Sequence, residues 1–238
     1  MIKYIFSTCL TLVIATALFS QTSIDSVLIC DAKFKDPKFN NPHAGSGFLL
    51  TYKDKTYACT AKHVLFFAKT DKMQSISFGD DLKSWSFKPN PSATNGVKAD
   101  RLVNEDSTEN LKMPPKGDWL VFEIKGKAPD HTVIYELRKK PLNIGEVVYF
   151  LGYPYKATQP IRIRGTFEGF TKDNNLSLSV PKGTYNGCSG GPVLDEEGKV
   201  VGLVSMGYFD KQHQKMIFEP ASTDYFKQIM TKHTNNHP

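Results

Sequence analysis

A succession of short apolar segments separated by turns constrains the fold of this chain more than any other feature. Segments 45–52 (GSGFLLTY), 118–124 (DWLVFEI) and 145–154 (GEVVYFLGYP) have the length of strands, and polar groups such as KDK and TKDNN separate neighbouring segments. Only the region after Ser222 shows helical spacing of apolar residues, and Ser222 can cap that helix. Many short strands and one terminal helix predict an all-β architecture, a barrel or a sandwich.

Residues 88–117 interrupt this pattern. The segment is rich in proline, asparagine and charged residues and has little hydrophobic periodicity. Such composition predicts a long surface connection rather than a strand or a helix.

The N-terminus has the layout of an export signal. Lys3 precedes an apolar stretch at 4–19, and Ser20 offers a small residue for cleavage. We therefore expect residues 1–20 to be removed and the mature chain, 21–238, to be secreted or periplasmic. The alternative is an uncleaved membrane anchor; after cleavage no stable membrane association is expected.

Composition narrows the class of protein. With 40% apolar residues the chain is expected to be globular. The net charge of +6 is spread along the sequence without a basic run interleaved with aromatics, so we expect no nucleic-acid partner. Beyond the signal, Cys30, Cys59 and Cys188 are too few for a disulfide framework and lack metal-site spacing. No metal or cofactor is predicted, a monomer is expected, and whether any disulfide forms stays open.

The stretch NGCSGGPV, 186–193, places Ser189 between a cysteine and two glycines just before an apolar strand. Ser189 is either a turn former or a nucleophile. A base could come from His63, which follows a strand and is flanked by apolar residues, although a satisfied core histidine is the alternative. An acid could come from Asp118, which directly precedes WLVF, although a turn aspartate is the alternative. Together these three residue types can support acyl transfer.

The segments AGSGFLL, TAKHV, DWLVF, GCSGGPV and GLVSMG, in this order, resemble the signature segments of the chymotrypsin-like (trypsin-like) serine peptidases. These segments are most similar to those of the bacterial trypsin-like and HtrA-type branch, and no segment resembling a PDZ domain is expected after them. The resemblance covers roughly residues 44–230, and the order His, Asp, Ser along the chain distinguishes this family from other triads of the same geometry.

The resemblance implies two six-stranded β-barrels with the active site between them. The first barrel is expected at about 40–125, the second at about 141–220 and the terminal helix at about 222–233. The linker between the barrels would fall at about 126–140.

The resemblance also implies residue roles. Ser189 would be the nucleophile, His63 the general base and acid, and Asp118 the orienting acid. The oxyanion hole would consist of the backbone N–H groups of Gly187 and Ser189. Because Cys188 stands where digestive relatives carry an aspartate that receives a new N-terminus, no activation of that kind is expected.

Substrate contacts follow from the same resemblance. Gly183 and Thr184 map onto the specificity pocket, and the strand edge Ser205, Met206 and Gly207 maps onto the site where an extended peptide adds. The absence of an acid at Gly183 gives no reason for a preference for Lys or Arg, so small or medium apolar residues are favoured weakly.

The sequence therefore predicts a secreted serine endopeptidase, a hydrolase that cleaves polypeptides through an acyl-enzyme. Two alternatives stay open. One is an inactive relative that uses the groove for binding, and the other is an esterase on the same fold.

Overall fold

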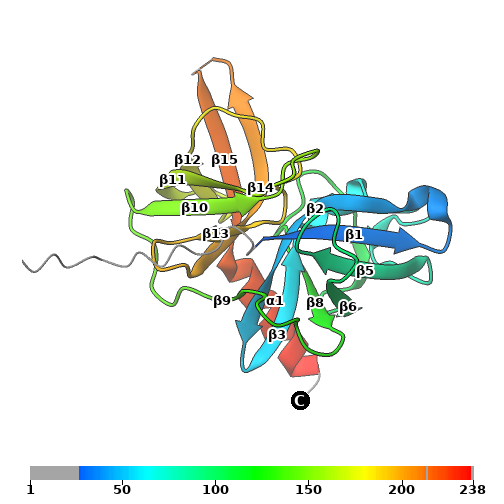
Figure 1. Ribbon diagram of the computed structural model, residues 1–238. Coiled ribbons are helices and arrows are strands. Elements are labelled where there is room, and N and C mark those ends of the chain that lie inside the picture. The colour runs from blue at the N-terminus through cyan, green and yellow to red at the C-terminus, as the bar shows by residue number, and fades with distance from the viewer. Residues whose placement is uncertain (1–26, 213, 237–238) are drawn as a thin grey trace, which may run out of the picture.

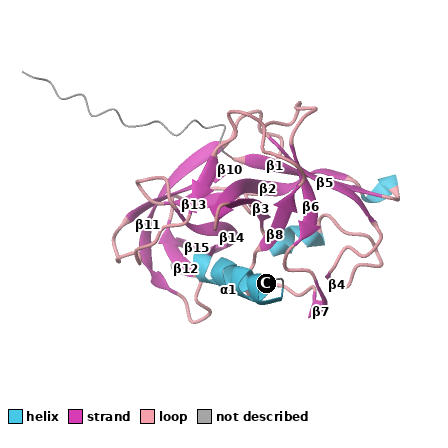
Figure 2. Ribbon diagram, turned by 90° about the horizontal axis from the view of Figure 1, so that it is seen from below, coloured by secondary structure: helices cyan, strands magenta, loops and turns pink. Residues whose placement is uncertain are grey.

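Two β-barrels lie side by side, and the helix α1 (Thr223–Asn236) lies on the underside where they meet (Figures 1 and 2). The computed structural model describes residues 27–212 and 214–236. The predicted signal segment 1–20 lies outside the described residues.

The first barrel closes through six antiparallel strands in the order β1-β5-β6-β8-β3-β2, with β1 pairing back to β2. A further strand, β9, lies in the linker between the barrels and joins β2 in parallel. The strands of this part are β1 (Leu28–Phe34), β2 (Asn41–Tyr52), β3 (Lys55–Thr60), β5 (Leu82–Lys88), β6 (Val97–Leu102), β8 (Leu120–Ile124) and β9 (Ile134–Glu136).

The second barrel closes in the order β10-β11-β12-β15-β14-β13. Beyond the barrel wall, β14 and β15 continue as a long hairpin that projects from the molecule (Figure 1). The strands are β10 (Val147–Gly152), β11 (Ile161–Phe170), β12 (Leu176–Ser179), β13 (Pro192–Leu194), β14 (Val200–Asp210) and β15 (Lys215–Ser222). The prediction of an all-β fold with two six-stranded barrels and a C-terminal helix is confirmed.

The first barrel begins earlier than the predicted boundary near residue 40, because β1 is one of its walls. This strand was not predicted from the sequence LICDAKF, because Asp31 interrupts its apolar run. In the structure Asp31 is buried, and the ammonium of Lys88 lies 2.5 Å from its carboxylate. This ion pair allows a charged residue to occupy a barrel strand.

The prediction that 88–117 is a surface connection is wrong for two parts of that segment. Strand β6 is a barrel wall, and β7 (Asp106–Asn110) pairs with β4 (Ser75–Ile76) in a small separate sheet. Only Val97 and Leu102 of β6 are buried, so the hydrophobic periodicity of this strand is weak. Backbone pairing with β5 and β8 makes it a strand nonetheless.

Helix α1 is anchored on an aromatic cluster of the first barrel. The buried ring of Phe226 lies 5.4 Å from Trp119 and 5.6 Å from Tyr52, measured between ring centroids. The Trp119 indole N–H donates to the carbonyl of Ser222, 3.0 Å away. Because Trp119 follows Asp118 directly in the chain, this packing also supports the segment that carries Asp118.

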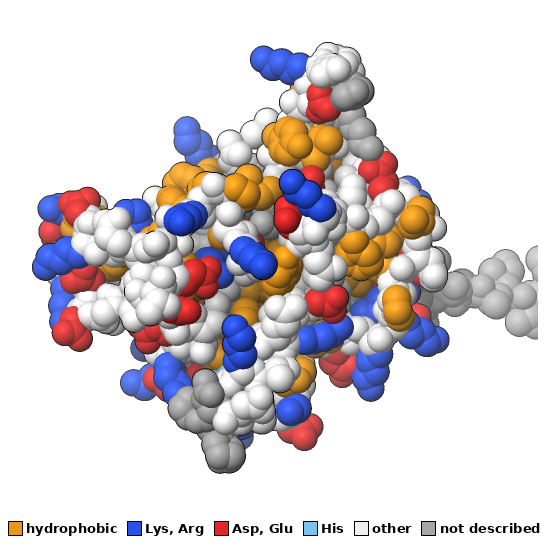
Figure 3. Space-filling model, turned by 180° about the vertical axis from the view of Figure 1, so that it is seen from behind, with side chains coloured by type: hydrophobic (Ala, Val, Ile, Leu, Met, Phe, Trp, Pro, Cys, Tyr) orange, Lys and Arg blue, Asp and Glu red, His pale blue; other side chains and the backbone are white. Residues whose placement is uncertain are grey.

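The surface carries charges of both signs. On the face shown in Figure 3, Lys and Arg side chains alternate with Asp and Glu, and small apolar patches lie between them. Within residues 27–212 and 214–236, no helix combines the length and apolarity needed to cross a membrane.

We expect Phe226→Ala to lower the free energy of unfolding by about 3–5 kcal/mol, because it removes a buried ring from the junction of helix and barrel. Chemical denaturation followed by tryptophan fluorescence measures this change. The exposed Gln228 of the same helix provides the control, since Gln228→Ala should change stability by less than about 0.5 kcal/mol. An equal effect of both substitutions would contradict the packing role of Phe226.

Candidate active site

Three side chains that lie far apart in the sequence meet between the barrels. His63 Nδ1 lies 2.6 Å from Asp118 Oδ2, and His63 Nε2 lies 2.7 Å from Ser189 Oγ. The imidazole therefore bridges a carboxylate and a hydroxyl, with one ring nitrogen on each.

The local structure of the first barrel holds His63 in place. Strand β3 ends at Thr60, and the short 3-10 helix η3 (Lys62–Phe66) turns the chain so that His63 faces the barrel interface. The backbone N–H of His63 donates to Asp118 Oδ1 at 2.8 Å. His63 is only 5% exposed, so its orientation is fixed by both backbone and side-chain contacts.

Asp118 precedes β8 and is 2% exposed. Its carboxylate accepts hydrogen bonds from the backbone and ring of His63 and from the hydroxyl of Ser205. Ser205 belongs to β14 of the second barrel, so both barrels contribute to the environment of this carboxylate. Sequence reasoning placed Ser205 on the substrate edge and missed its side-chain contact. A hydroxyl residue inside the apolar run VVGLVSM was the available signal.

The electrostatics of His63 reflect competing causes. Burial of the ring lowers its pKa, while the negative charge of Asp118 and the hydrogen bond to it raise the pKa. The net result is a pKa above the ordinary histidine value. The imidazolium of His63 is thus favoured by its carboxylate partner.

The turn before β13 carries Ser189 and depends on glycine. Gly187 and Gly190 have φ angles of 97° and 86°, a region that residues with a Cβ rarely adopt. A Cβ on Gly190 would lie 2.3 Å from Thr60 Oγ1, so the turn packs directly against the first barrel.

Hydrogen bonds from both barrels fix the peptide groups around Gly187. The N–H of Tyr155 donates to the carbonyl of Asn186 at 3.0 Å, which orients the peptide that carries the Gly187 N–H. The hydroxyl of Ser46 donates to the Gly187 carbonyl at 2.8 Å, and the Ser46 N–H donates to the Ser189 carbonyl at 2.7 Å. Within the described part of the chain, the N–H groups of Gly187 and Ser189 have no hydrogen-bond acceptor.

Cys188 is a buried thiol rather than a competing nucleophile. Burial raises its pKa to about 12, so the thiol stays protonated near neutral pH. The side chain packs against Gly152, where an added Cβ would lie 2.3 Å from the Cys188 Cβ. Cys30 and Cys59 are likewise buried, and none of these three cysteines forms a disulfide.

The residues predicted to bind substrate lie along two segments beside Ser189. Pairing of β14 with β13 ends at Leu203. Ser205 lies at an irregularity in the pairing of β14 with β15, and Met206 and Gly207 are paired with β15 alone. Gly183 and Thr184 are exposed in the loop after β12. Among the described residues no hydrogen bond joins Gly183 or Thr184 to the three central side chains.

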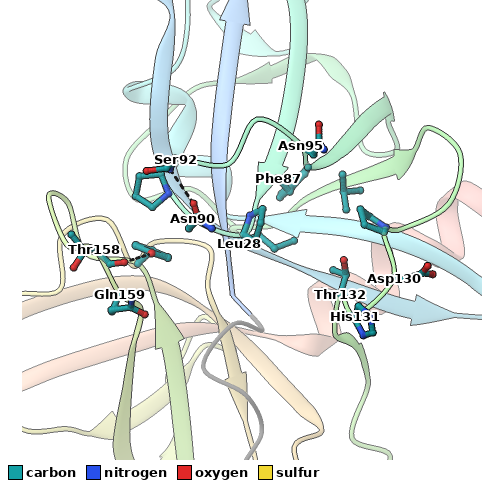
Figure 4. Close-up of a pocket in the computed structure, with 16 residues that line it drawn as sticks. Leu28, Phe87, Asn90, Ser92, Asn95, Asp130, His131, Thr132, Thr158 and Gln159 are labelled. Atoms are coloured by element: carbon teal, nitrogen blue, oxygen red, sulfur yellow. Dashed lines mark hydrogen bonds between the residues drawn. The ribbon is translucent and has the colours of Figure 1, made fainter.

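A separate cavity of about 570 Å³ lies at the junction of the barrels (Figure 4). None of the three central side chains lines it. It is connected to them through Tyr153, which borders the cavity and whose N–H donates to the Ser46 hydroxyl at 2.8 Å. Within residues 27–212 and 214–236, no three His, Cys, Asp or Glu side chains are grouped so that they could hold a metal ion.

Comparisons with known proteins agree with this geometry. A crystal structure of the serine endoprotease from Yersinia pestis shares the fold, with a TM-score of 0.58 and 19% identity, over 88% of this chain and 63% of that chain. This chain thus corresponds to less than two thirds of that protein. A comparison with curated protein sequences gave no match. The profile described as trypsin-like peptidase domain matches residues 45–203, more than half of the sequence. The chain belongs to the trypsin-like peptidase domain family and has the chymotrypsin-like fold.

Proposed function

We propose that this protein is a serine peptidase that cleaves polypeptides internally through Ser189, His63 and Asp118, with a covalent acyl-enzyme. The contact of one imidazole with both a buried carboxylate and a hydroxyl, at 2.6 and 2.7 Å, is the observation that carries the proposal. This arrangement matches the roles of nucleophile, base and orienting acid in acyl transfer.

In the proposed reaction Ser189 Oγ attacks the carbonyl carbon of the scissile bond and its proton passes to His63 Nε2. The oxyanion accepts hydrogen bonds from the N–H groups of Gly187 and Ser189. The bond from Tyr155 to the Asn186 carbonyl orients the first of these peptides, and the bond from the Gly191 N–H to the Cys188 carbonyl, at 2.9 Å, orients the second. His63 then donates the proton to the leaving amine, and the C–N bond breaks. Water, activated by His63, hydrolyses the ester that remains on Ser189.

Asp118 has two tasks in this scheme. It accepts a hydrogen bond from the Nδ1–H of His63, which fixes the tautomer with an unprotonated Nε2, and its charge stabilises the imidazolium that forms. The hydroxyl of Ser205 donates a hydrogen bond to the buried carboxylate of Asp118 and so takes the place of water as its partner.

We further propose that an extended substrate adds to β14 at Ser205–Gly207, where pairing with β13 has ended. Gly183 and Thr184 would border the pocket for the residue before the cleaved bond. With no acid at those positions, an apolar residue is the expected occupant. Export to the periplasm or the exterior is proposed from the N-terminal pattern of residues 1–20 alone.

Ser189→Ala is expected to lower kcat by about 10⁶-fold, the order found when such a nucleophile is removed. Purified mature protein and the variant are incubated with a diverse peptide library, and products are read by mass spectrometry. A serine-directed phosphonylating probe should label Ser189 in the native chain only.

The neighbouring Cys188→Ala is the matched control. It should keep both labelling and cleavage, because the buried thiol has no chemical role. Loss of labelling in Cys188→Ala together with retained labelling in Ser189→Ala would show that Cys188, and not Ser189, is the nucleophile. Absence of cleavage and labelling in the native chain would favour a binding role, and cleavage of esters without peptides would favour an esterase.

The pH profile of kcat/KM provides a second test. Catalysis requires neutral His63, so activity should rise as pH increases through the pKa of His63 in the free enzyme. Because that pKa is raised, the midpoint of the acidic limb should lie above the ordinary histidine value of 6.5. A midpoint below 6.5 would contradict the influence of Asp118.

Asp118→Asn should shift the same midpoint downward, since burial then acts on His63 without an opposing charge. We also expect kcat to fall by about 10⁴-fold, because the amide favours the wrong tautomer. An unchanged midpoint in Asp118→Asn, measured by the same profile, would show that another group titrates.

A further inference from the structure

Two aromatic side chains remain exposed close to the catalytic residues. Phe67 is 63% exposed and Tyr155 is 42% exposed. Exposed aromatic rings at the edge of a functional site often contact a ligand, since burying them on binding is favourable.

The direction of the substrate determines what these rings can contact. Ser189 lies between two strands: the next residue, Gly190, donates its N–H to Val204 of β14 at 2.8 Å, and Ser46 of β2 donates to the Ser189 carbonyl at 2.7 Å. In the proposed function the acyl half of the substrate pairs with β14. The leaving half must then extend from Ser189 over the β2 side.

Tyr155 lies at the start of that path. Its backbone N–H is bonded to Asn186, and a Cβ on Gly187 would lie 2.6 Å from the Tyr155 nitrogen. The Tyr155 ring meets His43 of β2 edge to face, with 4.8 Å between ring centroids. Tyr155 is therefore fixed directly beside the proposed oxyanion hole.

Phe67 contacts the same strand through its backbone. It follows η3, the 3-10 helix that carries His63, and its N–H donates to the Val64 carbonyl at 3.0 Å. The Phe67 carbonyl accepts a hydrogen bond from Asn41 Nδ2 of β2 at 2.8 Å.

Asn41 and His43 lie at the start of β2, where its pairing with β1 is irregular, and the backbone N–H of His43 donates to Asn41 Oδ1 at 3.0 Å. A continuous series of contacts thus joins Phe67 to Tyr155 across the start of β2, through Asn41 and His43.

The imidazole between them carries no charge near neutral pH. Burial lowers the pKa of His43, and this effect exceeds the opposing influence of the Tyr153 and Gly187 carbonyls. The surface formed by Phe67, His43 and Tyr155 is therefore aromatic and neutral, which suits an apolar side chain better than a charged one.

We propose that Phe67 and Tyr155 form an aromatic subsite for the leaving half of the substrate, so that this peptidase prefers a large apolar or aromatic residue among the first two positions after the cleaved bond. This inference rests on the proposed function. It assigns a selectivity that the pocket around Gly183 and Thr184 does not provide.

The test compares native protein, Phe67→Ala and Tyr155→Ala in two assays. In the peptide library, the native chain should show about tenfold enrichment of Phe, Tyr, Trp or Leu at one of those two positions, and each variant should lose most of it. In the second assay an N-acyl amino-acid nitrophenyl ester, which has no residue after the cleaved bond, forms the acyl-enzyme. Phenylalanine amide or glycine amide then competes with water, attacking the ester carbonyl as Ser189 Oγ leaves.

Native enzyme should transfer its acyl group to phenylalanine amide about tenfold more efficiently than to glycine amide, and both variants should reduce that ratio. Hydrolysis of the ester itself should stay within about twofold of native in Phe67→Ala, because the subsite is then empty. Ile144→Ala, which removes another exposed apolar side chain (77% exposed) from the second barrel, is the control and should change neither ratio.

Three results would overturn the inference. These are no enrichment in the native library, a nucleophile ratio that both variants retain, or a loss of ester hydrolysis equal to the loss of selectivity, which would show support of the oxyanion hole instead. If the native protein neither hydrolyses the ester nor reacts with the phosphonylating probe, the proposed function fails, and this inference with it.

Discussion

The buried carboxylate of Asp118 is the interaction on which the rest of the structure depends. An unpaired charge at that depth would be strongly destabilising, whereas a carboxylate with several donors is tolerated. The donors come from two places: His63 of the first barrel supplies its backbone and ring, and Ser205 of the second supplies a hydroxyl. The solvation of one charge thus requires both barrels to be docked, and the docked arrangement is the one that brings His63 to Ser189.

A second set of contacts places the opposite end of the site. Ser46 contacts three residues of the second barrel. Its N–H donates to the Ser189 carbonyl, its hydroxyl donates to the Gly187 carbonyl, and its hydroxyl accepts from the Tyr153 N–H. On the underside, Trp119 and Phe226 hold α1 against the segment that carries Asp118. Side-chain hydrogen bonds between the barrels and aromatic packing beneath them therefore define the same interface from two sides.

Much of this arrangement could be predicted from the sequence. The strand-length apolar segments predicted an all-β fold, and the resemblance of five segments to a known family implied the two barrels and the three residues that meet. Strands β1 and β6 were not predicted, because charged residues interrupt their apolar patterns. These residues are paired across the sheet, Asp31 with Lys88 and Arg101 with Glu123. Such pairs cannot be recognised before the order of the strands is known. The contact of Ser205 with Asp118 was not predicted for a related reason. It depends on how two barrels dock, which local periodicity does not describe.

The division of the site between the barrels has a consequence for biosynthesis. A ribosome completes the first barrel, with His63 and Asp118, before the chain that contains Ser189 has been made. Ser189, Gly187 and the Ser205 hydroxyl all arrive with the second barrel and take their positions only against Ser46, Thr60 and Asp118 of the first. A nascent or half-unfolded chain consequently lacks an assembled site.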